Sequence, residues 1–159
     1  MQSVTIASLE GHPLNSNGVI VMQQMIMINT RPQDAYRRQD VMTASSGDLI
    51  VMLYDALKKN IILGRRCIDK RDIMGAHRYL MKAQDIVSEL INSLDMNYKI
   101  SEELLTMYEF MLRQLQDANI HKDKEPLVPV IEMVDNIREA WKEICAANKG
   151  TMCFSEEQA

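Results

Sequence analysis

The side chains that most often carry chemistry are few in this chain, and their spacing does not fit a known kind of metal site. The chain has three histidines, His12, His77 and His121, and three cysteines. No Cys or His pair has the spacing of zinc ligands, and no histidine follows a Glu by three residues, as di-iron bundles require. We therefore expect no metal and no cofactor.

His77 is the one histidine in a helical position that suits phosphotransfer. Bundles of that kind usually carry a Lys three residues after the histidine, followed by Gly, whereas here Leu80 stands at that place. The chain also lacks a phosphate-binding loop, a G-x-S-x-G elbow and a distinct pair of carboxylates for acid–base work. We expect no catalytic residue and no enzymatic activity.

The composition restricts the partners and the compartment. The net charge is −4 and the basic residues are dispersed, so nucleic-acid binding is not expected. No apolar run reaches the ~20 residues of a membrane span, and residues 18–28 lack the basic flank of a signal peptide. An odd number of cysteines without framework spacing favours reduced thiols in the cytosol. The 13 methionines indicate either core filling or an adaptable binding surface.

Four amphipathic segments predict an all-α fold. Apolar residues recur every three to four positions in residues 46–69, 72–94 and 101–119, and again from Pro126 onward. Asp72 and Ser101 are predicted caps, and Asn119 a left-handed stop. Short connections make neighbours antiparallel, which predicts an up-down helical bundle of four long helices. A short N-terminal helical segment at 34–42 precedes them. We expect a tail or upstream extension at 1–31, a bundle domain at 32–148 and a flexible tail at 149–159.

The first long helix carries more apolar surface than one core contact needs. Projected at ~100° per residue, its apolar arc spans roughly 200°, about twice the usual core-facing stripe. Two interpretations are open: a central helix covered on two sides by its own chain, or a helix beside a groove that accepts a partner helix. We assign Leu49, Met52, Leu53 and Ala56 to the core, and the partner edge to Ile50, Tyr54, Leu57 and Ile61.

Five stretches, in order, resemble the flagellar secretion chaperone family, FliS. They are 35–45 (AYRRQDVMTAS) with 49–57 (LIVMLYDAL), then 83–86, 94–101 and 118–120, and the last helix around Trp141. The resemblance covers about residues 34–146. It implies a small bundle in the bacterial cytosol that binds the C-terminal segment of flagellin in apolar grooves. It also implies that the chaperone prevents premature polymerisation and assists delivery to the flagellar type III export apparatus.

The resemblance also implies which residues meet flagellin. They are Tyr36, Val41 and Thr43 in an N-terminal segment that flagellin displaces, with Ile50, Tyr54, Leu57 and Ile61 on the first long helix. Further partners implied are the export gate and other flagellar regulators, and the chaperone itself is expected to be a monomer or weak homodimer. The alternative is a regulatory bundle, either phosphotransfer-like through His77 or self-associating through the apolar strip.

Overall fold

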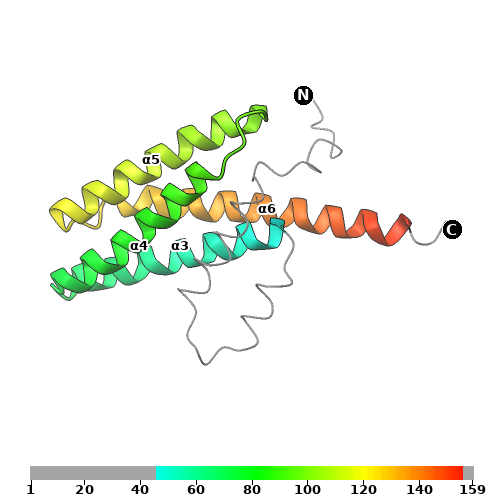
Figure 1. Ribbon diagram of the computed structural model, residues 1–159. Helices are drawn as coiled ribbons and strands as arrows, with labels where there is room; N and C mark the ends of the chain where they lie inside the picture. Colours follow the sequence, from blue (N-terminus) through cyan, green and yellow to red (C-terminus); the bar gives the residue numbers. More distant parts are fainter. Residues whose placement is uncertain (1–45, 156–159) are drawn as a thin grey trace.

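The computed structural model describes the backbone of residues 46–155 and the side chains of residues 47–147. Its elements are α3 (Ser46–Asp69), α4 (Ile73–Asn92), α5 (Lys99–His121) and α6 (Leu127–Ser155), all joined by short turns (Figure 1). The predicted all-α, up-down architecture is confirmed. The predicted short helix at 34–42 lies outside the described residues.

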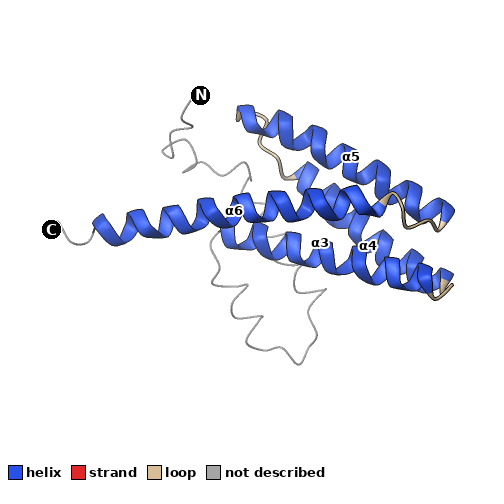
Figure 2. Cartoon of the chain, turned by 180° about the vertical axis from the view of Figure 1, so that it is seen from behind, coloured by secondary structure: helices blue, strands red, loops and turns tan. Residues whose placement is uncertain are grey.

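α3 occupies the centre of the arrangement. It packs extensively against α4 on one side and α6 on the other, while α5 packs mainly against α4 and only lightly against α6. The α3–α4 and α5–α6 turns share one end of the bundle, and the α4–α5 turn lies at the other end (Figure 2). α6 continues past the start of α3 in both views.

Most residues of the predicted apolar stripes are buried, but Leu94 and Ile144 are only partly buried. All five residues predicted for the α5 stripe are buried, from Leu104 to Ala118. On α4, Ile73 fits the apolar spacing and was expected to face the core, but it is 52% exposed; Ile86, which was not expected there, is fully buried. Ile73 is the first helical residue after the α3–α4 turn, so it lies at the rim, where no facing helix covers it.

The predicted caps were right for α4 and wrong for α5. The Asp72 carboxylate accepts a hydrogen bond from the Gly75 N–H at 2.9 Å, which satisfies a first-turn amide. Ser101 lies inside α5 and donates instead to the Asp95 carbonyl at 2.6 Å. The left-handed residue at the end of α5 is Lys122, not Asn119, which is buried and still helical.

α6 begins where its prolines allow it to begin. Pro126 precedes the helix and Pro129 falls in its first turn, where backbone amides need no intrahelical acceptor. The helix then continues to Ser155, past the predicted domain end at 148. Gly150 therefore does not stop it, since one interior glycine costs a helix only about 1 kcal/mol.

Candidate functional site

The four helical residues assigned to a partner are buried inside the bundle. Ile50 is 2% exposed, and Tyr54, Leu57 and Ile61 are 0% exposed, as members of one continuous apolar core. The residues Met52 and Ala56, assigned to the core, are only partly buried. Leu49 and Leu53 are buried core residues as predicted, while Met52 and Ala56 pack only against the edge of that core. Contact of Ile50, Tyr54, Leu57 and Ile61 with a partner remains a prediction. In this structure the four side chains belong to the core.

The breadth of the α3 arc has a simple cause. Gly64 lies against Leu80 of α4, and a Cβ at this glycine would lie 2.9 Å from two Leu80 side-chain atoms. Lys58, about 120° further round α3, lies against α6. A helix with neighbours on both sides needs an apolar arc wider than the usual ~100° stripe. An angular projection shows the width of such an arc but not which neighbour covers each part.

Tyr54 joins three helices at the middle of the core. Its hydroxyl shares a hydrogen bond with the hydroxyl of Tyr108 on α5, and Trp141 of α6 also hydrogen-bonds to it. Burial raises the pKa of Tyr108 to about 12 and raises that of Tyr54 well above 10.0. Both phenols therefore stay neutral at physiological pH, and each buried hydroxyl has a partner.

The side between α5 and α6 is the least tightly packed side of the described bundle. The two helices meet at their common turn and diverge toward the Lys99 end of α5 (Figures 1 and 2). Leu104, Tyr108 and Trp141 are nevertheless at most 6% exposed. The apolar side chains behind this side are therefore buried, although α5 and α6 contact each other only lightly.

Partly buried methionines flank this side. Met133 of α6 is two residues, about 200° round the helix, from Asp135, which faces α3. Met107 of α5 is about 120° round its helix from Asn119, which faces α4. Both thioethers therefore lie toward the α5–α6 side, where flexible side chains suit an adaptable contact.

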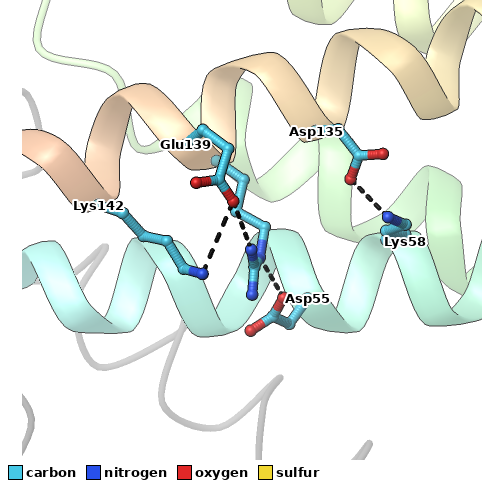
Figure 3. Close-up of polar contacts among 6 residues, drawn as sticks. Asp55, Lys58, Asp135, Glu139 and Lys142 are labelled. Carbon is cyan, nitrogen blue, oxygen red and sulfur yellow. Dashed lines mark hydrogen bonds and ion pairs between the residues drawn. The ribbon is translucent and has the colours of Figure 1, made fainter.

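The opposite side, between α3 and α6, is closed by ion pairs. Lys58 contacts Asp135 at 2.6 Å and Asp55 contacts Arg138, while Glu139 lies near Arg138 and Lys142 of its own helix (Figure 3). Further along, Asp69 contacts Lys124 at 2.6 Å. The three pairs 55–138, 58–135 and 69–124 share one register. A move of any number of residues forward along α3 corresponds to the same number of residues backward along the chain from Arg138 to Lys124, as antiparallel packing requires. These pairs set the register of α3 against α6 on a solvent-facing edge.

Among the described residues, His77 and Cys67 are the remaining candidates from the sequence, and they lie in different surroundings. His77 is exposed and its Nδ1 lies 3.2 Å from the Asn119 Oδ1, so it links α4 to α5. Cys67 is partly buried, and desolvation with the nearby Asp72 raises its thiol pKa. Within the described residues, no three His, Cys, Asp or Glu side chains gather as metal ligands would. None of the described helices combines the length and the hydropathy that a membrane span needs.

Two residues of the central cluster, Tyr108 and Trp141, were predicted only as members of apolar stripes. Their polar atoms gave a usable signal, because a buried Tyr hydroxyl or Trp N–H usually needs a partner. Tyr36, Val41 and Thr43 lie outside the described residues.

Comparison of the sequence with known proteins finds matches to flagellar secretion chaperones. A sequence model of the flagellar protein FliS matches residues 27–148. The flagellar secretion chaperone FliS of Bacillus subtilis (strain 168) is 38% identical over 112 residues, which cover 70% of this chain and 84% of that protein. The chaperone of the same name from Salmonella typhimurium is 32% identical over 107 residues, 65% of this chain and 79% of that protein. The matches span nearly all of the described bundle, and they place the chain in the FliS family of flagellar secretion chaperones.

Proposed function

We propose that this chain is a cytosolic export chaperone that binds the C-terminal segment of flagellin, prevents its premature polymerisation and assists its delivery to the flagellar type III export apparatus. The family consists of flagellar secretion chaperones rather than enzymes, which favours this function over a regulatory phosphotransfer bundle. A chaperone of this kind needs no nucleotide, metal or membrane contact, because extended apolar burial can offset the ordering of an unstructured segment.

The observation that carries the proposal is the lightly packed α5–α6 side. Apolar side chains lie between two diverging helices, and partly buried Met107 and Met133 flank them. An amphipathic flagellin helix would bury its apolar face there. Ile50, Tyr54, Leu57 and Ile61 would then form the floor beneath it. In this proposal Tyr36, Val41 and Thr43 belong to a segment that competes with flagellin for the same side.

Titration of the full chain with a fluorescent flagellin C-terminal peptide tests this proposal. Replacement of Met107 or Met133 by Asp should weaken binding about tenfold or more, because a charge would be desolvated against the bound helix. The matched control is Met81→Asp, on the outer face of α4, where Met81 is 38% exposed. Circular dichroism should show a folded chain for all three variants.

The proposal fails if the peptide does not saturate at tens of micromolar, or if Met81→Asp weakens binding as much as the other two. Ile50→Asp is not a suitable probe, because this buried position should unfold the bundle. Sedimentation of the free chain separately tests the expected monomer or weak homodimer. The export gate and other flagellar regulators remain proposed partners in addition to flagellin.

A further inference from the structure

The α3–α4 turn gathers positive charge in a chain that is negative overall. Residues 65–78 hold five basic side chains and two acidic ones, while the whole chain has a net charge of −4. All five basic residues are exposed: Arg65, Arg66, Lys70, Arg71 and Arg78. The basic residues are dispersed along the chain as a whole, but the structure gathers these five around one turn.

The two acidic residues of this turn already have other partners. Asp69 pairs with Lys124 at 2.6 Å, and the Asp72 carboxylate accepts the Gly75 N–H at 2.9 Å. None of the five basic side chains forms an ion pair with another residue in the described part of the chain. Lys70 and Arg78 both lie near enough to Cys67 to act on its thiol. Arg65 also acts on Asp69, and the Arg78 guanidinium lies 5.0 Å from the centre of the Tyr79 ring, but the five cations still outnumber the two carboxylates of residues 65–78.

Two exposed apolar side chains stand among these charges. Met74 is 77% exposed and Ile73 is 52% exposed, at the start of α4. A third exposed apolar side chain, Ile120 at the end of α5, lies close by and is 75% exposed. Its neighbour Asn119 hydrogen-bonds to His77, which lies one helical turn after Met74. An apolar centre with a charged rim is the usual composition of a protein–protein contact.

Arg71 occupies a backbone position that glycine would adopt more easily. Its φ is 57°, in the left-handed region, where a side chain costs roughly 1 kcal/mol or more relative to Gly. The helix-terminating turn therefore carries an exposed Arg at the expense of backbone stability. A strained position at a charged, exposed tip favours a functional use of that side chain.

We propose that the α3–α4 turn docks an acidic protein surface that presents carboxylates around an apolar side chain. Four of the five cations are Arg, whose planar guanidinium pairs with carboxylates in bidentate geometry, and Arg is also enriched at interface hot spots. An anionic membrane would attract Lys and Arg alike, so the Arg bias favours a protein. The turn lies at the end of the bundle opposite the end where α5 and α6 diverge, so both partners can be bound together.

A synthetic helical peptide with Glu on one face and Leu on the other serves as the probe, with the full chain carrying methyl-labelled methionine. The peptide should bind saturably and shift the Met74 methyl resonance, but not that of Met96 at the other end of the bundle. Arg71→Glu with Arg78→Glu should weaken binding about tenfold or more, and added salt should weaken it further. Arg71→Gly should weaken binding about threefold while leaving the thermal stability equal or higher.

The matched control for charge is Arg113→Glu, an exposed position midway along α5. The single variant Arg71→Glu carries the same change of charge as Arg113→Glu and should weaken binding more. The proposal is overturned if the two weaken binding equally, because net charge alone would then explain the loss. It is also overturned if phosphatidylglycerol vesicles bind the chain while the acidic peptide does not. Flagellin peptide binding should be unchanged in Arg71→Glu, so failure here is separable from failure of the proposed function.

Discussion

At the scale of single residues, the Tyr54–Tyr108 hydrogen bond is the main polar link across the core. It joins α3 to α5, whose backbones contact each other less than those of sequential helices. Two phenols buried in apolar surroundings resist ionisation, since the charged form would lose its hydration. The stability that they contribute should therefore depend on pH in the alkaline range.

The sign of that dependence follows from the folded pKa values, which are raised above the ordinary value of 10.0. The stabilisation is complete below pH 10, where both states hold the proton, and is lost as the pH rises toward about 12. Tyr108→Phe should cost about 1–2 kcal/mol at pH 7, because the Tyr54 hydroxyl loses its partner. It should also flatten the alkaline loss. Urea titrations at pH 7 and above pH 10 measure both effects, with Tyr98→Phe in the α4–α5 turn as the control. If Tyr108→Phe loses as much unfolding free energy between these pH values as the unchanged chain does, the argument is refuted.

Gly64 permits the close approach of α3 and α4. A methyl group there would lie 2.9 Å from Leu80 Cγ and Cδ2, so Gly64→Ala should destabilise the bundle by roughly 1–3 kcal/mol. This loss should exceed the ~1 kcal/mol that Ala gains in helix propensity. Thermal unfolding measures the effect. The double variant with Leu80→Ala should lose less than the sum of the two single variants, and strict additivity would contradict the proposed clash.

At the scale of the helices, the α3–α6 ion pairs set register more than they add stability. Their side chains are 23–50% exposed, in the range where a single pair contributes only about 0–1 kcal/mol. Their value lies in regular spacing along two antiparallel helices, because a shifted register would place like charges opposite each other. These ion pairs also hold α3 and α6 together along their shared edge. Among the described residues, no comparable row of ion pairs joins α5 to α6.

A charge swap across these helices tests the pairing. Lys58→Glu should destabilise the bundle by about 0.5–1 kcal/mol through repulsion with Asp135, and added Asp135→Lys should restore most of the loss. The control is Glu143→Lys, at an exposed position of α6, which should have little effect. Chemical denaturation at low and at high salt measures the difference, which salt should reduce. Failure of the second change to rescue the first would show that the contact does not couple the helices.

At the scale of the whole molecule, the fold was predictable because local signals agreed with each other. Apolar spacing fixed α4 and α5, Asp72 marked a cap, and Pro126 marked where α6 begins. The edges of α3 were not predictable, because a projection of one helix contains no information about its neighbours. The ion-pair row depends on register, which no single segment encodes. The cluster of basic residues at 65–78, by contrast, could be predicted from the sequence. The net charge of −4 for the whole chain gives no sign of it, because acidic residues elsewhere outweigh it.

Hydrogen exchange of the full chain, with and without the flagellin C-terminal peptide, tests the central claim most directly. The account predicts slower exchange along α5 and α6 around Met107 and Met133 when the peptide is bound, with the α3–α4 turn unchanged. The amides of residues 34–45 should behave in the opposite way. They should exchange faster when the peptide is bound, because the peptide would displace this segment from the same side. A peptide that leaves α5 and α6 unchanged at saturating concentration, or protects only residues 65–78, would contradict the account.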